Sequence, residues 1–316
     1  MKSPVYSVVV PAFNEQDVIK ETYTRLTKVM TGMGEAYELI FVNDGSKDQT
    51  AQIVAGFCEN DSSVRLINFT RNFGHMPAIS AGMEYARGQA VFIIDADLQD
   101  PPEVFPEMAA RWKEGYHVVY GKRIKRKGET IFKRMTAKIF YRFLRKMTSV
   151  DLPPDTGEFR LIDRKVCEAV NRLPEKNRYI RGLVSWVGFK QVPVEYHREK
   201  RFAGETKYPL RKMISFAMDA ITSFSNKPLK FATLIGIIIS ILSFLYILYV
   251  ICQVFFTDQT RTGWASTIAA ILFTQGIVLM LLGLMGEYIG RIYTEIQNRP
   301  NYIVQEIIEK DNIQYK

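Results

Sequence analysis

The sequence predicts an α/β protein in which a mainly parallel sheet is followed by two membrane-spanning helices. Three observations support this fold class. Over about the first 120 residues, β-branched apolar runs alternate with amphipathic stretches; polar residues collect where the apolar runs end; and two long uncharged runs lie in the last third of the chain. Alternation of this kind is typical of a mainly parallel sheet covered by helices on both faces.

Five apolar runs predict the first strands, at 6–10, 37–42, 64–69, 90–95 and 117–121. The stretches between them predict four helices, at Glu15–Met30, Thr50–Cys58, Pro77–Tyr85 and Pro102–Trp112. Two further strands are predicted at 156–164 and 188–196. In such sheets ligands bind beyond the carboxyl ends of the strands. The polar residues that follow the first four strands therefore predict a single cleft.

Two uncharged runs predict a pair of membrane-spanning helices. The first, 231–256, would extend roughly 39 Å at about 1.5 Å per residue, and the hydrocarbon core needs only about 30 Å. The second is 264–286. Lys and Arg are concentrated before the first run and after the second, so the positive-inside rule predicts a multi-pass protein of the cell (plasma) membrane with both termini cytoplasmic. A pair of buried core helices is the alternative, but such helices seldom run so far without a charged face.

These runs define the expected domains. We expect a cytoplasmic domain over 1–228, a transmembrane domain over 229–290 and a cytoplasmic tail over 291–316. Amphipathic helices at the membrane surface are expected at about 129–147 and 209–226, because the apolar residues there recur at helical spacing.

A basic segment follows the fifth predicted strand. Between Lys122 and Lys146 there are eleven Lys and Arg residues against one acid, Glu129. A basic amphipathic helix is typical of a membrane-surface element, and a solvated charged face is the alternative. Nucleic acid is not an expected partner despite the formal charge of +9, since the chain carries no recognisable nucleic-acid-binding module.

Two carboxylates, Asp95 and Asp97, directly follow the fourth predicted strand. Carboxylates two residues apart, on a chain leaving a sheet, can share a hard cation such as Mg²⁺ or Mn²⁺. Such a site takes its remaining ligands from water and phosphate, which suits a diphosphate substrate. The tripeptide is common in surface loops, so its position after a buried strand is what gives it weight. Asp100 and Glu103 are expected to shape the turn and cap the next helix.

Asp44 and Gly45 follow the second predicted strand in the stretch VNDGSKD. A carboxylate here can accept hydrogen bonds from a uracil or a ribose, and a glycine lets the backbone approach a ligand. A simple turn explains the same residues, and the two interpretations are compatible. The chain has neither a GxGxxG fingerprint nor a P-loop.

Six motifs in this order resemble a known family: PAFNE, VNDGS, TRNFGH, DADLQDPPE, TGEFRLIDR and RFAGETKY. Together with the two carboxy-terminal apolar runs, they resemble the family 2 glycosyltransferases that act on polyprenyl phosphates. That group includes bactoprenol glucosyltransferases and dolichyl-phosphate mannosyltransferases. The resemblance covers nearly the whole chain. It implies the A-type glycosyltransferase fold, which is Rossmann-like, and transfer of a sugar from a nucleotide donor to a lipid phosphate with inversion at the anomeric carbon.

The resemblance also implies roles for individual residues. The nucleotide-sugar pocket would be formed by Pro11, Ala12, Asn14, Glu15, Asp44, Asp95 and Gln99. The metal, Mg²⁺ or Mn²⁺, would be held against the donor diphosphate by Asp95 and Asp97. The phosphate clamp would consist of Arg201 and Lys207, and with Asp97 and Glu158 these make up the expected catalytic residues. The lipid phosphate would be received by Lys122, Arg123, Lys133 and Arg134.

Glu158 departs from the pattern, because members of the family usually carry Asp at this position, often proposed as the catalytic base. The acceptor is a phosphate monoester whose second pKa is about 6, so it is mostly a dianion at neutral pH and needs little proton removal. A metal and basic side chains would stabilise the departing diphosphate. Glu158 is therefore expected either to act as a base or to orient the sugar or a basic residue, and a surface salt bridge is the third interpretation.

The predicted function is metal-dependent transfer of a sugar to undecaprenyl phosphate for cell-envelope glycosylation. The donor is expected to be UDP-glucose or UDP-N-acetylhexosamine, with GDP as the alternative nucleotide, and the spacing of the motifs does not specify the sugar. The expected partners are the nucleotide-sugar donor, the polyprenyl phosphate acceptor, the lipid bilayer and a separate flippase. Monomer and homo-oligomer both stay open.

Two other functions are weighed against this one. A processive polysaccharide synthase resembles this chain in fold, but it carries a QxxRW motif, and the only Arg-Trp pair here, Arg111-Trp112, has Met108 in the Gln position. Two membrane helices are also too few for a translocating pore. A catalytically silent membrane adaptor that binds lipid should have lost the metal carboxylates or the phosphate loop, and both are present.

Overall fold

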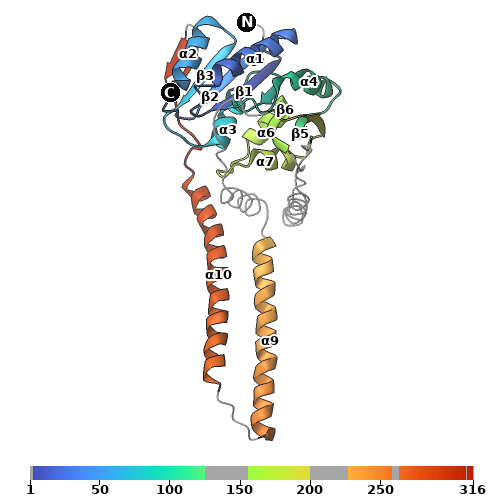
Figure 1. The fold of residues 1–316 in the computed structure, drawn as a ribbon, viewed down its shortest axis with the longest axis vertical. Helices are drawn as coiled ribbons and strands as arrows, with labels where there is room; N and C mark the ends of the chain where they lie inside the picture. The colour runs from blue at the N-terminus through green and yellow to red at the C-terminus, as the bar shows by residue number, and fades with distance from the viewer. Residues whose placement is uncertain (1–2, 125–155, 200–226, 258–262, 311, 316) are drawn as a thin grey trace. The chain divides into compact units, whose positions relative to one another are not determined.

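The computed structural model describes residues 3–124, 156–199, 227–257, 263–310 and 312–315 (Figure 1). The chain divides into two compact units. The first contains the sheet and includes residues 300–316, and the second contains the two long helices. The predicted surface helices at 129–147 and 209–226 lie outside the described residues.

The described strands form one nine-stranded sheet in the order β7-β5-β6-β4-β1-β2-β3-β8-β9. The strands are β1 (Tyr6–Ala12), β2 (Tyr37–Asn43), β3 (Val64–Phe69), β4 (Ala90–Ile93), β5 (Val118–Arg123), β6 (Thr156–Asp163), β7 (Gln191–Tyr196), β8 (Val304–Glu309) and β9 (Asn312–Tyr315). The central strands β1 to β4 are parallel, and β5 is parallel to β7. The antiparallel members are β6, between β4 and β5, and β8, between β3 and β9.

These strand directions bring many chain segments to one edge of the sheet. The carboxyl ends of β1 to β5 and of β7 lie there, together with the amino ends of the antiparallel strands β6 and β8. We call this edge the site edge. Loops at the carboxyl ends of parallel strands are where ligands bind in α/β sheets.

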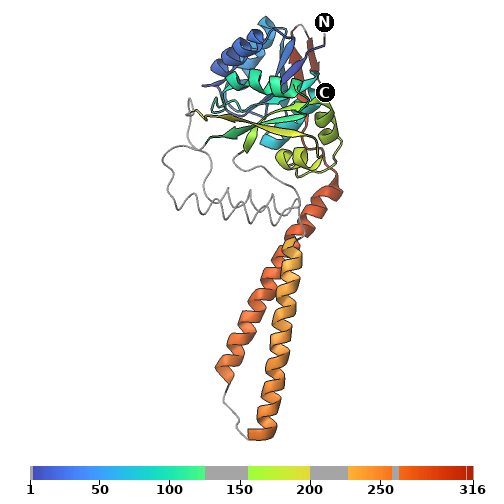
Figure 2. The ribbon, with the colours of Figure 1, turned by 90° about the vertical axis from the view of Figure 1, so that its right-hand side faces the viewer.

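Helices cover both faces of the sheet (Figures 1 and 2). The described helices of this unit are α1 (Ile19–Gly32), α2 (Thr50–Asn60), α3 (His75–Tyr85), the 3₁₀ turn η1 (Pro102–Val104), α4 (Phe105–Lys113), α6 (Arg164–Asn171) and α7 (Ile180–Trp186). Buried residues of α1, α2 and α4 share one core cluster with Val8, Phe41 and Phe92 of the strands. On the other face α3 packs on β1 and β2, so closely that a Cβ at Gly82 would lie 2.1 Å from Val9 Cγ1. The predicted α/β fold is therefore confirmed.

The predicted elements match the described ones closely, with three shifted helix starts, and α6 and α7 were not predicted. The helix expected from Pro102 begins with the 3₁₀ turn η1, and α4 starts at Phe105. The helix expected from Glu15 begins at Ile19, because Asn14 has a positive φ of 54° and the residues after it form turns. The helix expected from Pro77 begins at His75, and a proline is tolerated in a first helical turn because its missing N–H has no intrahelical partner there. The strands β8 and β9 were not predicted, and they lie within the expected tail.

Both apolar runs form helices. The helix α9 covers Lys227–Thr257 and α10 covers Trp264–Gln297. Each contains a span long and apolar enough to cross a membrane, at Lys227–Tyr246 and Phe273–Gln297. Large apolar side chains on both are exposed, for example Phe244 and Met280. Exposed apolar surface of this extent is suited to a nonpolar surrounding rather than to water.

An ion-pair network attaches β8 to the sheet. The Arg65 guanidinium of β3, only 5% exposed, lies between two carboxylates, 3.0 Å from Glu38 and 2.8 Å from Glu309. Arg87 also donates to Glu309, at 2.8 Å. Although burial opposes it, the charges of Arg65 and Arg87 hold the pKa of Glu309 below its usual value. The end of the chain is thus held to β3 by charge as well as by backbone pairing.

We predict that Arg65→Ala destabilises the sheet unit strongly. The variant leaves the carboxylates of Glu38 and Glu309 without their shared cation, and breaking a buried pair costs about 3–5 kcal/mol. Arg87→Ala, whose side chain is 54% exposed, is the control and should cost about 1 kcal/mol or less. Thermal unfolding of the detergent-solubilised chain measures both, and equal melting temperatures for the two variants would contradict this account.

Candidate active site

Four carboxylates gather at the site edge. Asp95, Asp97 and Asp100 follow β4, which ends at Ile93, and Glu158 stands near the start of β6. Because β6 runs antiparallel to β4, with Ile93 opposite Arg160, Glu158 continues past the end of β4 toward the same loop. Residues more than 50 positions apart in the sequence are thereby brought together.

Of the four carboxylates, Asp95 has the negative charge that the described neighbouring groups balance least. Its side chain is 31% exposed, and its Oδ1 lies 3.4 Å from His75 Nε2. Burial raises the pKa of Asp95; His75 opposes the shift, while the negative charges of Asp97, Asp100 and Glu158 add to it. Among the described residues no group donates a hydrogen bond to Oδ1. An uncompensated carboxylate oxygen beside other acids is a fitting ligand for a divalent cation.

Asp97 lies in a strained loop. It is 9% exposed, and its Oδ1 accepts a hydrogen bond from the Gln99 amide at 3.1 Å. Between them the buried Leu98 has a φ of +55°. Such a conformation costs on the order of 1–3 kcal/mol and persists only where the surroundings enforce it, which is frequent at ligand sites. The carbonyl of Gln99 is held in turn by the Glu199 amide, at 2.9 Å.

The donor set fits Mg²⁺ or Mn²⁺ bound together with a phosphate ligand. Within the part of the chain that is described, three or more His, Cys, Asp or Glu side chains do not converge as a complete metal site. Mg²⁺ commonly binds through only one or two carboxylates and completes its octahedron with water and substrate phosphates. Asp95 and Asp97 meet this requirement, because they are hard oxygen ligands on one short loop.

Asp100 is fully compensated, in contrast to Asp95. It is 1% exposed and accepts a 2.5 Å hydrogen bond from the Tyr196 hydroxyl of β7. The guanidinium groups of Arg123 and Arg198 lie 3.6 and 3.7 Å from its oxygens, and Arg123 also donates to the Tyr196 hydroxyl at 3.1 Å. Burial and the adjacent Asp100 raise the pKa of Tyr196, so the hydroxyl remains a donor.

The expectation that Asp100 and Glu103 cap the following helix is therefore wrong. The residue before η1 is Pro101, and it makes no side-chain capping bond. Glu103 instead binds Arg25 of α1 through two hydrogen bonds, at 2.6 and 3.1 Å. Asp100 therefore links the loop to β7, and Glu103 links it to α1, because their side chains bond to residues of these distant elements rather than to the start of the helix.

Glu158 lies between two arginines. Its side chain is 6% exposed, with Oε1 2.7 Å from Arg181 Nε and Oε2 3.6 Å from Arg160 Nη2. Arg160 is 4% exposed and donates to the Gly157 carbonyl at 2.9 Å, and burial lowers its pKa. Arg181, on α7, also donates to the Thr156 carbonyl, at 2.7 Å. The carboxylate thus fixes the position of the partly exposed Arg181 guanidinium.

The loops after β1 and β2 are joined by hydrogen bonds. The Asn14 amide donates to Ser46 Oγ at 3.0 Å, and the Lys47 amide donates to Asn14 Oδ1 at 2.9 Å. The next amide, of Glu15, donates to Thr50 Oγ1 at 2.9 Å. Pro11 and Ala12 end β1 directly before this junction. The predicted nucleotide residues of the first motif therefore lie at one joined pair of loops, whereas Asp95 and Gln99 belong to the loop after β4.

Asp44 connects the second loop to the third. It is 3% exposed, and its two oxygens accept from the amides of Phe73, at 2.7 Å, and Gly74, at 2.9 Å. Burial raises the pKa of Asp44, although the two amides act in the opposite direction. Gly45 has a φ of +66°, and a Cβ there would lie 2.4 Å from the Arg71 carbonyl carbon. A glycine is required because the two backbones are in direct contact.

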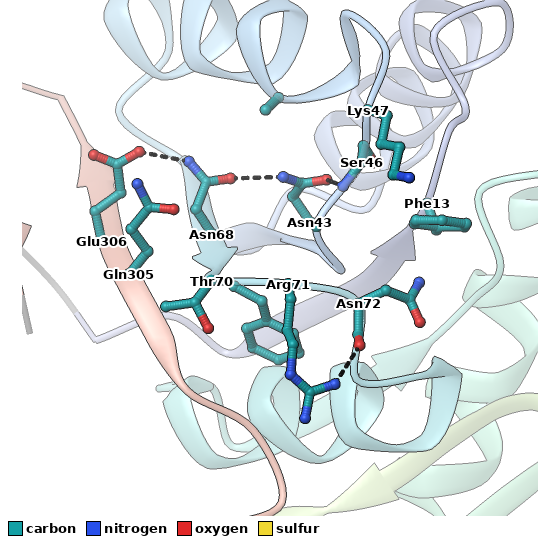
Figure 3. Close-up of a pocket in the computed structure, with 13 residues that line it drawn as sticks. Phe13, Asn43, Ser46, Lys47, Asn68, Thr70, Arg71, Asn72, Gln305 and Glu306 are labelled. Carbon is teal, nitrogen blue, oxygen red and sulfur yellow. Dashed lines mark hydrogen bonds between the residues drawn. The ribbon is translucent and has the colours of Figure 1, made fainter.

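A pocket of about 490 Å³ opens beside these loops (Figure 3). Phe13, Ser46 and Lys47 line it from the first two loops, and Arg71 and Asn72 line it from the third. Further parts of the wall are supplied by Asn43 and Asn68 at the strand ends and by Gln305 and Glu306 of β8. The lining combines carboxamides, two hydroxyls, cations, a carboxylate and two phenyl rings, which suits a polar heterocyclic ligand.

The predicted basic residues separate into two groups. Arg123 points to Asp100, whereas its neighbour Lys122 lies 2.7 Å from Glu195, because successive side chains of a strand point to opposite faces. The other predicted basic residues, Lys133, Arg134, Arg201 and Lys207, lie outside the described residues.

Several residues at the site edge were not predicted. They are His75, Arg160, Arg181, Tyr196 and Glu306. His75 and Arg160 lie inside the quoted motifs TRNFGH and TGEFRLIDR, which was the available signal. The other three reach the site through pairing between distant segments.

Comparison with known proteins identifies the family. A model described as glycosyl transferase family 2 matches residues 7–170, and one described as GtrB C-terminal hairpin matches residues 227–292. The chain belongs to glycosyl transferase family 2, and the resemblance carried by the six motifs is confirmed.

Relatives match over nearly the whole chain. The glycosyltransferase YkcC of Bacillus subtilis is 59% identical over 95% of this chain and 93% of its own. The SfII prophage-derived bactoprenol glucosyl transferase of Shigella flexneri is 40% identical over 95% of this chain and 97% of its own. Among solved structures, mannosyl-3-phosphoglycerate synthase from Rubrobacter xylanophilus is 16% identical over 69% of this chain and 72% of its own, with a TM-score of 0.47.

We predict that Asp95→Asn raises the melting temperature of the metal-free protein at neutral pH. The variant removes a partly buried charge beside Asp97, Asp100 and Glu158. Since the pKa of Asp95 is raised in the folded state, stability falls as pH rises through that pKa, and the wild type carries the full penalty above it. The gain should vanish below about pH 3.9, where wild-type Asp95 is protonated in both states. Melting curves in EDTA across this pH range measure the effect, and a lower melting temperature for the variant at neutral pH would refute it.

Proposed function

We propose that the protein transfers a sugar from a nucleotide donor to a polyprenyl phosphate, with inversion at the anomeric carbon. The observation that carries the proposal is the pair Asp95 and Asp97 at the site edge. It lies beside Asp100 and Glu158, whose negative charges are balanced by arginines, and on the same edge as the joined loops after β1 and β2. The relative named bactoprenol glucosyl transferase matches across both the sheet unit and the two apolar helices. We further propose undecaprenyl phosphate as acceptor and UDP-glucose or a UDP-N-acetylhexosamine as donor.

In this proposal the side chains act mainly by stabilising charge at the reacting groups. Asp95 and Asp97 hold Mg²⁺ or Mn²⁺, a cation type that family 2 members commonly use, and the bound ion supplies positive charge to the leaving diphosphate. The acceptor phosphate is already mostly a dianion at neutral pH and attacks the anomeric carbon without a strong base. Two anions must nevertheless approach each other. Cationic side chains near the loop, Arg181 among them, lower that repulsion.

We assign Glu158 to positioning rather than to proton transfer. The Glu158 carboxylate lies 2.7 Å from the Arg181 guanidinium and 3.6 Å from that of Arg160, so its oxygens are already engaged by two cations. Its contact fixes the position of the Arg181 guanidinium, which is 22% exposed. The extra methylene of Glu relative to Asp lets the carboxylate reach both arginines from the start of β6.

We propose that α9 and α10 cross the membrane as a hairpin. The strand β8, which follows α10, pairs with β3 of the sheet unit, so both ends of the hairpin connect to the same folded unit. Two crossings of the membrane return the chain to the side on which the sheet unit lies, whereas a single crossing does not. With Lys and Arg concentrated at the ends joined to the sheet unit, the positive-inside rule favours a cytoplasmic sheet unit and tail. A product formed there requires a separate flippase to reach the other side.

The test is transfer by the purified chain. It is incubated with undecaprenyl phosphate and a panel of labelled UDP- and GDP-sugars, with Mg²⁺, with Mn²⁺ or with EDTA. Lipid-linked sugar should form from one donor and stop in EDTA. The absence of transfer from every donor with either metal would refute the enzyme, and polymeric product would point to a processive synthase.

Asp97→Ala should lower transfer by roughly 100-fold or more, because one of two proposed metal ligands is lost. The matched control is Glu107→Ala, which removes an exposed carboxylate on α4 and should leave kcat/KM unchanged. Steady-state rates with saturating metal provide the measurement. Metal-dependent transfer retained by Asp97→Ala would exclude the ligand role.

Glu158→Gln separates the two roles of that residue. If it orients Arg181, kcat/KM should fall by roughly 10- to 100-fold while the shape of the pH profile stays the same. Arg181→Ala should fall at least as far, and the double variant should be no slower than Arg181→Ala alone, because both changes remove one interaction. A pH profile that loses its acidic limb only in Glu158→Gln would instead identify Glu158 as the base.

A further inference from the structure

The carboxy-terminal strand β8 forms one wall of the pocket beside the nucleotide loops. Gln305 and Glu306 line it, although they are more than 230 positions from Asn68 and Asn43 in the sequence. The strand is firmly held: it pairs antiparallel with β3, and Tyr302, just before it, stacks on Phe69 with ring centroids 5.0 Å apart. A segment that follows α10 is therefore built into the site edge.

Hydrogen bonds run from Glu306 to Ser46 of the second loop (Figure 3), and one further bond joins Ser46 to the first loop. Asn68 Nδ2 donates to Glu306 Oε1 at 2.8 Å, and Asn43 Nδ2 donates to Asn68 Oδ1 at 3.0 Å. The Ser46 amide donates to Asn43 Oδ1 at 3.1 Å, and the Asn14 amide donates to Ser46 Oγ at 3.0 Å. We call this series the amide relay.

The relay has a direction, and Glu306 sets it. Every link donates toward Glu306, which as a carboxylate has acceptors only. A carboxamide has both a donor and an acceptor and can turn over, so an amide chain needs a fixed end to select one orientation. Asn43 and Asn68 are 6% and 8% exposed, which leaves little water to replace a lost partner. The acceptor-only end therefore fixes both carboxamides and, through them, the amide of Ser46.

Loss of the Glu306 carboxylate would misalign the loop after β2 rather than unfold the sheet. If Asn68 turns over, its amide faces the amide of Asn43, and the bond from Ser46 loses its acceptor in turn. Ser46 and Lys47 line the pocket directly, and both bond to Asn14. Backbone pairing of β8 with β3 and the Glu309 network do not involve the relay. The relay and the docking of the strand are thus separable.

We propose that β8 is a working part of the nucleotide-binding site and that Glu306 is a positioning residue for the donor. This inference rests on the proposed function, since it takes the pocket between Phe13 and Arg71 as the donor's nucleoside site. It extends that function by making the segment after the second apolar helix necessary for tight donor binding. The chain end and the membrane hairpin are then linked, through the covalent chain, to the affinity for nucleotide.

The test measures UDP binding by calorimetry and donor KM with the full-length chain in detergent. Glu306→Ala should weaken UDP binding and raise the donor KM by about 2- to 10-fold, the size of one hydrogen bond, with little change in kcat. Glu306→Gln should bind UDP with an affinity between those of wild type and Glu306→Ala, because its amide oxygen can accept from Asn68 but its carboxamide no longer excludes the reversed orientation. Asn68→Ala combined with Glu306→Ala should be no weaker than Asn68→Ala alone.

Glu309→Gln is the matched control for Glu306→Gln, since it makes the same chemical change on the same strand. Glu309 belongs to the ion-pair network with Arg65 and Arg87 rather than to the relay. It should lower the melting temperature and leave the UDP affinity unchanged. The inference is overturned if Glu306→Ala binds UDP as wild type does, if Glu306→Gln is as weak as Glu306→Ala, or if Glu309→Gln weakens binding equally. Wild-type protein that binds neither UDP nor GDP would instead overturn the proposed function itself.

Discussion

The charge balance of four carboxylates at one edge of the sheet is the constraint on which the rest of the site depends. Asp100 is compensated by Tyr196, Arg123 and Arg198, and Glu158 is compensated by two arginines. Among the described cationic side chains, Asp95 has His75 alone, at 3.4 Å, and its raised pKa reflects burial and the acids around it. The described residues therefore supply fixed cations to Asp100 and Glu158, whereas Asp95 Oδ1 accepts no hydrogen bond from them and is available to a ligand that binds at this loop. Because uncompensated charge is expensive to keep in a partly buried loop, the strain at Leu98 and the ties from Gln99 to its neighbours are needed to hold that loop in place.

Much of the fold could be predicted because its signals are local. All seven predicted strands formed, five of them from apolar runs, and two long uncharged runs formed α9 and α10, since each pattern is contained in a single segment. The strands β8 and β9 were missed, because 304–309 is a short run with two acids, and a strand of that kind is stable only through its pairing with β3 and the contact of Glu309 with Arg65. The antiparallel place of β6 was missed for the same reason. Pairing between distant segments has no local signature, and here it decides which side chains reach the site.

The candidate site shows the same division. Asp95 and Asp97 were predicted as metal ligands because two carboxylates after a buried strand form a local pattern. Asp44 was predicted because it follows a strand in a recognisable turn, whereas Asn14 was implied only by the resemblance of the motif PAFNE. Asp100 was misjudged as a cap, since beside two prolines capping is the ordinary local role, whereas Tyr196 reaches it from β7. Glu158 was recognised by its motif, but its two arginine partners were not. The amide relay could not be predicted from the sequence. Its side chains are Asn43, Ser46, Asn68 and Glu306, and they come within hydrogen-bonding distance only because β2, β3 and β8 are neighbours in the sheet.

The central claim is that the Asp95–Asp97 loop is completed by a divalent cation together with a nucleotide diphosphate. Mn²⁺ binding to the full-length chain, followed by electron paramagnetic resonance with and without UDP, tests it most directly. The account predicts weak Mn²⁺ binding by the protein alone, a clear tightening when UDP is added, and loss of that tightening in Asp95→Asn, since carboxylates and phosphate oxygens share the ion. Mn²⁺ affinity that is unchanged by UDP, or tightening that persists without the Asp95 carboxylate, would contradict it.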